Sequence, residues 1–287
     1  MKTTIFILNM IVFGLAIPQG ATAQEEEEQL RLSFSKPDEP GFMNIEVMQG
    51  NINITGYDGK EAIVQLSPYQ GEFNNYKMPP AVKPNDMKTG NEDVNTEGLE
   101  KIKSSSFDIN VTEEGNKITI KSGSLLNSGD LNIKVPYKCS FKISTINGNI
   151  SAKDVNGELE ITTINGKINL DNITGSAIAS TINGLLKVRF SEVTPDAPMA
   201  FSTINSHIDV TLPSQIKAIL KMKTDAGEIY SNFDLEIKEE LEKSSKSDKY
   251  SSASTSWSNW TTGKINGGGP ELVFKSLHGN IYIRKGE

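Results

Sequence analysis

The stretch STINGNI at residues 144–150 decides the fold, because variants of it return along the chain. The later copies read TTINGKI at 162–168, STINGLL at 180–186, STINSHI at 202–208 and, shortened, SLHGNI at 276–281. A fixed internal period is the sequence signature of a repeat architecture, so the period has to be interpreted before any single strand or turn.

The central repeats have a strict spacing of nine residues. Glycines stand at this spacing at Gly148, Gly157, Gly166, Gly175 and Gly184. Residues two and four positions after each glycine are apolar, so both lie on the same face of a strand. Every second glycine follows an uncharged Ser/Thr-Thr-Ile-Asn sequence, whereas the others follow KDVN or DNIT. The true repeat is therefore eighteen residues long and consists of two half-repeats.

This pattern predicts an all-β, single-domain parallel β-solenoid with coils of about 18 residues, two short strands per coil and Asn-Gly corners. Coils stacked at about 4.8 Å bring Thr145, Thr163 and Thr181 into one ladder. An antiparallel meander is the alternative, because Asn-Gly between alternating apolar residues is also a hairpin signal. The apolar residue seven positions after a glycine, such as Val155, falls on the wrong face of an unbroken strand, and this favours the solenoid.

The Asn-Gly pairs are expected to form the corners of the coils. Asn and Gly tolerate the left-handed backbone that a sharp corner requires, so we assign them to the scaffold rather than to ligand binding. The predicted corner residues are Asn147, Gly148, Gly157, Asn165, Gly166, Gly175, Asn183, Gly184, Asn205 and Gly279. Ser206 replaces a glycine, which leaves Asn205 to form that corner.

The N-terminal residues predict export. Lys2 precedes a mostly apolar run at 5–17, and Ala21-Thr22-Ala23 has the form of a signal-peptidase site. We therefore expect a signal peptide at 1–23, with a retained anchor as the alternative, followed by an acidic tail at 24–29. No later stretch is apolar enough for a transmembrane helix. The expected location is the periplasm, the outer-membrane surface or the extracellular space.

The rest of the chain is expected to form one domain at 30–287. Polar segments at about 68–103 and 239–264 are predicted to be insertions, and the second is Ser-rich with a helical turn near 235–242. The ends of a solenoid are open sheet edges, so irregular flanking strands and the terminal Arg284-Lys285 are expected to cap them.

With these repeats the chain resembles the bacterial putative-adhesin domain family, a group of exported β-solenoid proteins. The resemblance covers about 30–284 and is carried by STINGNI, TTINGKINL, STINGLLKV and the closing GGGPELVFKSLHGNIYI. It implies a β-solenoid with a role in adhesion. It supplies no set of catalytic residues.

Composition argues against several kinds of chemistry. The single cysteine, Cys139, excludes an intramolecular disulfide and is expected to be a small buried hydrophobe. Two histidines, His207 and His278, fall on predicted corners without companions at metal-ligand spacing, so neither a metal nor a cofactor is expected. A net charge of −7 without a basic stripe argues against nucleic-acid binding.

Carboxylates are the residues that a polysaccharide-cleaving β-helix would need. Asp154, Asp171 and Asp209 lie on outward parts of the repeat, but Asp154 and Asp171 are out of register by one place. No arginine or lysine is expected beside them at a repeating position. We interpret them as solvated surface charges and expect no enzyme activity.

Aromatic residues in the second insertion are the candidate binding site. YSSASTSWSNW at 250–260 contains Tyr250, Trp257 and Trp260, whose flat rings in a Ser/Asn setting suit a sugar or a protein partner. Alternatively, the rings fold back over an open face. The expected function is that of a non-catalytic exported adhesin for glycan, cell-surface or envelope partners. Alternatives are a structural or assembly protein of the envelope and, less favoured, a polysaccharide-degrading enzyme.

Overall fold

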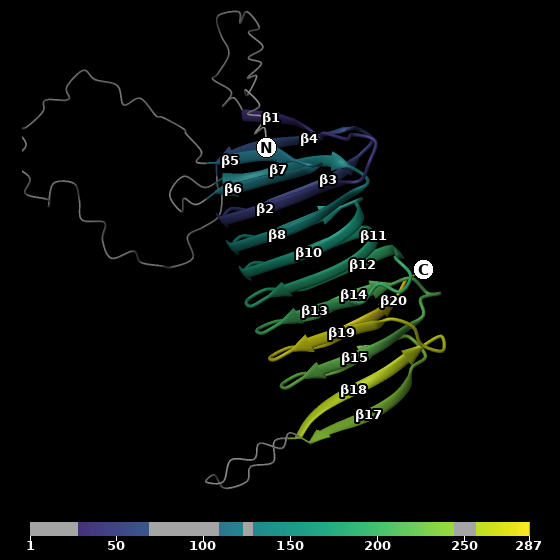
Figure 1. Cartoon of the computed structure of the whole chain (residues 1–287). Coiled ribbons are helices and arrows are strands. Elements are labelled where there is room, and N and C mark those ends of the chain that lie inside the picture. Colours follow the sequence, from purple (N-terminus) through teal and green to yellow (C-terminus); the bar gives the residue numbers. More distant parts are fainter. Residues whose placement is uncertain (1–27, 69–108, 123–128, 244–256, 287) are drawn as a thin grey trace, which may run out of the picture.

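The structure is a computed structural model that describes residues 28–68, 109–122, 129–243 and 257–286. These residues form one curled all-β sheet, shown in Figure 1. None of them lies in a helix long and apolar enough to cross a membrane. The predicted signal peptide at 1–23, most of the first insertion and part of the second lie outside the described residues.

The described residues contain twenty strands. The first ten are β1 (Glu28–Ser33), β2 (Gly41–Gln49), β3 (Ile52–Tyr57), β4 (Glu61–Pro68), β5 (Asn110–Glu114), β6 (Lys117–Ser122), β7 (Gly129–Pro136), β8 (Cys139–Asn147), β9 (Ile150–Lys153) and β10 (Asn156–Asn165). The others are β11 (Ile168–Thr181), β12 (Leu186–Val193), β13 (Met199–Thr203), β14 (Ile208–Leu212), β15 (Ala218–Thr224), β16 (Ile229–Ser231), β17 (Glu236–Lys243), β18 (Trp257–Ile265), β19 (Glu271–Ser276) and β20 (Ile281–Lys285).

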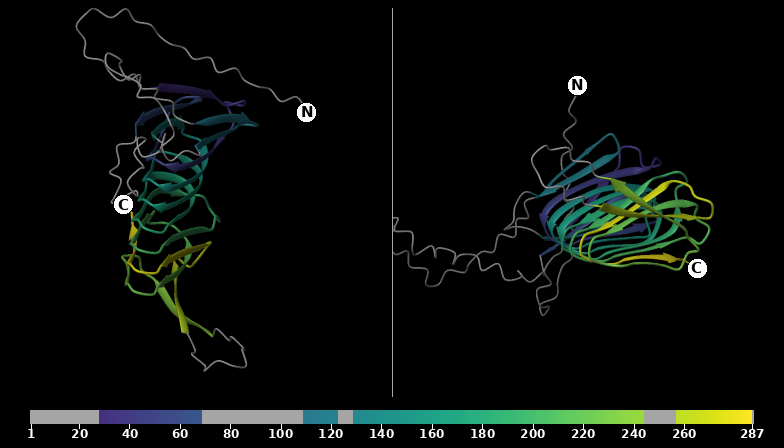
Figure 2. Two further views of the ribbon diagram at one scale, coloured as in Figure 1. Left: turned by 90° about the vertical axis from the view of Figure 1, so that its left-hand side faces the viewer. Right: turned by 90° about the horizontal axis from the view of Figure 1, so that it is seen from below.

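Hydrogen bonding arranges these strands in two rows that share β11. The first row runs β5–β6–β2–β8–β10–β11–β13–β19–β15–β18–β17, through the C-terminal half of β11. The second row runs β1–β4–β7–β3–β9–β11–β12–β14–β20–β16, in which β9 pairs with the N-terminal half of β11. Seen from below, the strands of each row lie over one another and the sheet is curled (Figure 2, right).

The eighteen-residue register is confirmed in the central strands. Thr145, Thr163 and Thr181 lie side by side on parallel strands, and Ile150 lies beside Ile168 in the second row. This parallel pairing contradicts the antiparallel meander for β8 to β12. After β12 the offset grows, so that Thr181 pairs with Thr203, because the loop after β12 adds residues.

The C-terminal strands do not cap the stack. β19 lies between β13 and β15, and β20 lies between β14 and β16, so the end of the chain is built into the middle of the sheet (Figure 1). The expectation that Arg284 and Lys285 cap an open edge is therefore wrong. Among the described residues, antiparallel strands stand at one end of both rows, with β1, β4 and β5, and at the other end of the first row, with β17 and β18, whereas the second row ends on β16, which pairs parallel with β20.

The hairpin of β17 and β18 also corrects the prediction of a helical turn near 235–242. Residues 236–243 form a strand that pairs antiparallel with 257–264. Its sequence EIKEELEK explains why it can stand at an edge, because charged side chains discourage pairing with another chain.

The core lies on the inward side of both rows. Side chains alternate between buried and exposed along the strands, as in β8, where Phe141 and Ile143 are buried and Lys142 and Ser144 are not. Buried residues of both rows form one hydrophobic cluster, in which the rings of Phe201 and Phe274 stack with centroids 5.3 Å apart. The prediction for Cys139 is confirmed, since its side chain is fully buried in this cluster.

The predicted reason for the corner glycines is wrong at most positions. Among the predicted corner residues, a left-handed backbone occurs only at Gly175, with φ of 125°. At Gly166 a Cβ atom would lie 1.9 Å from the carbonyl oxygen of Gly148, the corner glycine one coil earlier. Equivalent contacts exclude a Cβ at Gly148, Gly157, Gly184 and Gly279. Glycine is needed there because neighbouring segments approach one another too closely for a side chain. The corners predicted at Gly157 and Gly175 are wrong, because both glycines lie inside strands, in β10 and β11, where they pair with each other.

The corner asparagines form an outward ladder of amides. The Nδ2 of Asn165 donates to the Oδ1 of Asn147 at 2.9 Å, and Asn183 and Asn205 continue the chain of hydrogen bonds at 2.8 and 2.7 Å. His278 takes the next place, with Nδ1 at 3.2 Å from the Oδ1 of Asn205. These residues connect coils, as expected of a scaffold, although none of the four asparagines has positive φ.

Candidate functional site

The outward face of the second row carries a line of polar side chains, one from each strand in register. We name it the polar row; its members, in strand order, are Gln29, Gln65, Asn132, Asn53, Ser151, Asn169, Lys187, Asp209, Tyr282 and Tyr230. All of them are exposed or half-buried, and every member except Gln29 and Tyr230, at the two ends of the row, lies between two inward-facing apolar residues of its strand. The row has an uncharged end, a charged middle and an aromatic end.

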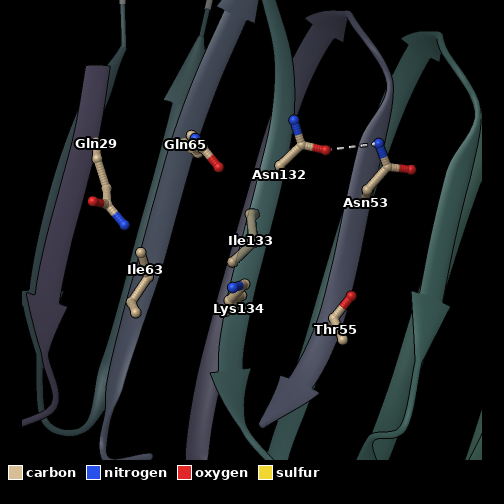
Figure 3. Close-up of a pocket in the computed structure, with 8 residues that line it drawn as sticks. All are labelled: Gln29, Asn53, Thr55, Ile63, Gln65, Asn132, Ile133 and Lys134. Atoms are coloured by element: carbon tan, nitrogen blue, oxygen red, sulfur yellow. Dashed lines mark hydrogen bonds between the residues drawn. The ribbon is translucent and has the colours of Figure 1, made fainter. Parts of the chain in front are cut away.

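Carboxamides make up the uncharged end (Figure 3). Gln29, Gln65, Asn132 and Asn53 stand on four neighbouring strands, and the Nδ2 of Asn53 donates to the Oδ1 of Asn132 at 3.0 Å. They line a shallow depression of about 120 Å³ together with Thr55, Ile63, Ile133 and Lys134. This volume is well below that of an ordinary ligand pocket, so the feature is a surface and not an enclosed site. Carboxamides offer both donors and acceptors, as hydroxyl-rich ligands require.

Two stacked tyrosines form the aromatic end. The rings of Tyr230 and Tyr282 lie 5.2 Å apart with an angle of 10° between their planes. Tyr230 is 45% exposed on β16, the last strand of the second row in the described part of the chain. Its hydroxyl donates to the carboxylate of Glu228, and this hydrogen bond raises the pKa of Tyr230.

Polar groups fix the ring of Tyr282 from several sides. Its hydroxyl accepts a hydrogen bond from the Nδ2 of Asn280 at 2.9 Å. The guanidinium carbon of Arg284 lies 5.5 Å from its ring centre, and the ring of His207 meets it edge-on at 6.0 Å. His207 also accepts a hydrogen bond at Nδ1 from the backbone N–H of Asn280, at 2.8 Å. We call Tyr230, Tyr282, His207, Asn280 and Arg284 the tyrosine cluster.

Arginines accompany two of the three aspartates singled out from the sequence, so the expectation that they have no basic partner is wrong. The Nε of Arg189 lies 2.6 Å from Asp171, and that of Arg284 lies 2.7 Å from Asp209. The hydrogen bond from Arg189 is the main cause that holds the pKa of Asp171 below its usual range. Asp154 instead accepts a hydrogen bond from the Nδ2 of Asn172 at 2.5 Å.

These contacts give each of the three carboxylates a polar partner on a neighbouring strand, and the backbone N–H of Asp154 donates to the carbonyl oxygen of Asp171 at 3.2 Å. A general acid needs a raised pKa, and that of Asp171 is lowered. In the described ranges, no group of three or more His, Cys, Asp or Glu is placed to hold a metal ion.

The aromatic residues predicted to bind a partner are not part of the polar row. Tyr250 lies outside the described residues. Trp257 begins β18 opposite Lys243, and Trp260 lies further along the same strand, half-buried, with the Nζ of Lys223 at 6.0 Å from its ring centre. Trp257 and Trp260 thus belong to the antiparallel end of the first row, whereas the tyrosine cluster lies in the second.

Sequence reasoning missed the two tyrosines, although a signal was present. Tyr230 and Tyr282 each stand three positions after a glycine, in GEIYS at 227–231 and GNIYI at 279–283. The same position in other copies holds Asn53, Ser151 and Asn169. Alignment of this outward column would have revealed most of the polar row.

Comparisons with known proteins add little to this geometry. No protein-family model and no curated protein matches the chain. A solved structure of a "putative cell adhesion protein" from Clostridium sporogenes ATCC 15579 is similar with a TM-score of 0.48 and 12% sequence identity, over 91% of this chain and 100% of that chain. A likeness this distant assigns no function, and the family resemblance seen in the repeats stays a prediction.

Proposed function

We propose that this chain is a non-catalytic exported adhesin whose parallel β-solenoid presents the polar row to a saccharide of a cell surface or of the envelope. The observation that carries the proposal is the line of polar side chains across the second row, in which amides and a hydroxyl group lead through Lys187 and Asp209 to the stacked tyrosines. The solenoid itself is inferred from the parallel register at eighteen residues in both rows.

The polar row suits a saccharide because of both its chemistry and its rigidity. Carboxamides at about 4.8 Å intervals offer hydroxyl groups paired donors and acceptors along a line. Tyrosine rings add a flat apolar area that loses little entropy on binding. Each of these side chains starts from a paired strand, so the surface is ordered before a ligand arrives.

A catalytic role is less well supported. Asp171, Asp209 and Asp154 each have a hydrogen-bond partner on a neighbouring strand, and the lowered pKa of Asp171 does not suit a general acid. An assembly protein that grows end to end is also disfavoured, because six of the eight residues in the sequence of the edge strand β17, EIKEELEK, are charged.

The test is glycan binding by the mature protein, residues 24–287, against immobilised neutral and acidic polysaccharides and against intact bacterial cells. Tyr230→Ala is the informative variant, because it removes the exposed ring of the cluster without opening the core. We expect affinity to fall about tenfold, as the loss of one aromatic contact would cause. Tyr137→Ala is the matched control, since Tyr137 is also an exposed tyrosine but lies between β7 and β8, away from the cluster.

Two results would overturn the proposal. One is the absence of binding to every polysaccharide and cell type by a protein that is folded by circular dichroism. The other is binding that Tyr230→Ala and Tyr137→Ala reduce equally, which would place the ligand elsewhere. Cleavage of a polysaccharide into shorter products would instead show that the protein is a polysaccharide-degrading enzyme.

A further inference from the structure

The outward face of the first row carries an uncharged stripe that is separate from the polar row. The stripe consists of a column of aliphatic side chains, each 37 to 39% exposed: Met48, Ile146, Ile164, Ile182, Ile204 and Leu277. Six strands at about 4.8 Å make this column about 24 Å long. Single exposed aliphatic residues are ordinary, but a continuous column of them marks an interaction surface.

A second outward column beside it consists of hydroxyl groups. Ser144, Thr162, Ser180 and Ser202 stand in register, and the hydroxyl of Ser202 donates to that of Ser180 at 2.9 Å. A third column adds Ile178, which is 52% exposed, with Ala200 and Val273 beside it on the next strands. The centre of the face is therefore uncharged over three columns.

Ion pairs border this uncharged area. Lys142 and Glu160 pair at 2.7 Å on one side, and Lys221 and Glu271 pair at 2.8 Å on the other. An apolar centre with a charged rim is the usual anatomy of a protein–protein interface.

The repeat period indicates which partner fits. Side chains recur at about 4.8 Å along the stack, so a surface with the same period can interdigitate with them at every strand. A second copy of this chain has the same period, whereas the side chains of a globular partner without repeats would match the spacing of the stripe at only a few strands. From this we infer that two copies associate face to face through the first row, about a two-fold axis that passes along β11 near Ser180 and Ile182.

Such an axis runs parallel to the strands and reverses their order, so each column faces its own counterpart. The aliphatic columns of the two copies then meet along their length, with Ile182 opposite Ile182 and Ile164 opposite Ile204. Ile146 faces Leu277 in the same way, whereas Met48, at the far end of the stripe, faces the position that follows Thr224 on β15, which is Asp225.

The charges at the ends of the hydroxyl column favour this reversed order. Glu46 stands three strands before Ser180, on β2, and Lys223 stands three strands after it, on β15. The two-fold arrangement places Glu46 of each copy opposite Lys223 of the other, with the exposed Lys275 diagonal to it. A face-to-face dimer that kept the strand order would instead place Glu46 opposite Glu46 and Lys223 opposite Lys223, and such contacts between like charges are unfavourable.

The interface lies on the opposite row from the polar row, so it goes beyond the proposed function and is tested separately. The mass of the mature protein is measured by analytical ultracentrifugation from low to several hundred micromolar, and we expect a dimer to accumulate with concentration. Ile182→Lys puts two like charges on the axis and is expected to leave a folded monomer, since a lysine is tolerated at an exposed position. Ile237→Lys, on the edge strand β17 outside the stripe, is the matched control and should dimerise like the unaltered protein.

A cross-link locates the axis. A residue on a two-fold axis meets itself, so Ser180→Cys should form a covalent dimer when mild oxidation with diamide converts two thiols to a disulfide. Ser151→Cys, on the polar row, should stay uncross-linked, and the native Cys139 is buried and does not compete. A protein that stays monomeric at all concentrations, or that cross-links through Ser151→Cys but not Ser180→Cys, would disprove the inference. Glycan binding per chain by Ile182→Lys should be unchanged, which separates this outcome from failure of the proposed function.

Discussion

The hydroxyl group of Thr163 donates a hydrogen bond to the carbonyl oxygen of Gly148, the corner glycine of the preceding coil, at 3.2 Å. Thr181 makes the same contact with Gly166 at 3.0 Å, and Thr203 makes it with Gly184 at 3.2 Å. The threonine ladder therefore does not bond to itself. Each of these three hydroxyl groups ties its strand to the corner that precedes the neighbouring repeat, where glycine leaves a carbonyl oxygen accessible.

Thr163→Val should lower the free energy of unfolding by about 1–3 kcal/mol, because it leaves the carbonyl oxygen of Gly148 without this partner in a buried setting. Valine keeps the shape of the side chain, so the loss reports the hydrogen bond rather than a cavity. Urea denaturation followed by circular dichroism measures the change.

Thr145 provides the control for this variant within the same ladder. Its hydroxyl is buried, and the described residues offer it no hydrogen-bond partner. Val47 fills the equivalent place on β2, one strand earlier. Thr145→Val should therefore leave stability unchanged or raise it slightly. Equal losses for Thr145→Val and Thr163→Val would show that the hydroxyl contact with the corner contributes nothing.

Gly166→Ala should destabilise the protein by about 3 kcal/mol or more, since its Cβ would overlap the backbone oxygen of Gly148, which cannot move without separating the coils. The melting temperature by differential scanning calorimetry measures the effect. In Gly263→Ala the nearest atom to the new Cβ is the Cδ1 of Leu235 at 3.5 Å, an ordinary contact. That variant should melt near the unaltered protein, and a similar fall in both would contradict the close-stacking explanation.

Much of the fold could be predicted because it repeats locally. The eighteen-residue period places Thr145 beside Thr163 and Ile150 beside Ile168, and alternation of apolar and polar residues assigns each to a face. The position of the last copy could not be predicted in this way. Ser276 pairs with Thr203 and with Thr224, so β19 enters between strands that precede it in the chain. No period links these residues, and only tertiary pairing decides their order.

The candidate site escaped prediction for a different reason. Tryptophans in a polar segment drew attention because they are rare, whereas Tyr230 and Tyr282 looked like ordinary members of degenerate repeats. The two rings can stack only because β16 and β20 pair with each other. This pairing results from the strand order, in which β20 lies between β14 and β16. The residues three positions after each glycine can be recognised as one outward column only when the register of the strands is known.

Acid should weaken the link between Asp171 and Arg189. Since the pKa of Asp171 is lower in the folded protein than the value of about 3.9 in an unfolded chain, its ionised form adds stability above that pH. The contribution is lost as the pH falls through the folded pKa. It is small, because the pair is largely exposed.

Arg189→Met should raise the pKa of Asp171 towards the ordinary value, because the main hydrogen bond that lowers it is removed. Carbon-13 NMR titration of the aspartate carboxyl signals measures this directly. The same titration of Asp171 in the unaltered protein is the reference. An Asp171 titration that is the same in both proteins would mean that the ion pair does not form in solution.

Cys139 should resist alkylation while the protein stays folded. Burial raises the pKa of its thiol to about 12, and the thiolate is the reactive form, so both access and ionisation are suppressed. Mass spectrometry after iodoacetamide treatment near neutral pH should show modification only at the rate of unfolding, and full modification in denaturant. Ser151→Cys introduces a second, outward thiol on β9 that should react at once in the same molecule. If both thiols react equally fast under native conditions, β8 does not hold Cys139 in the core.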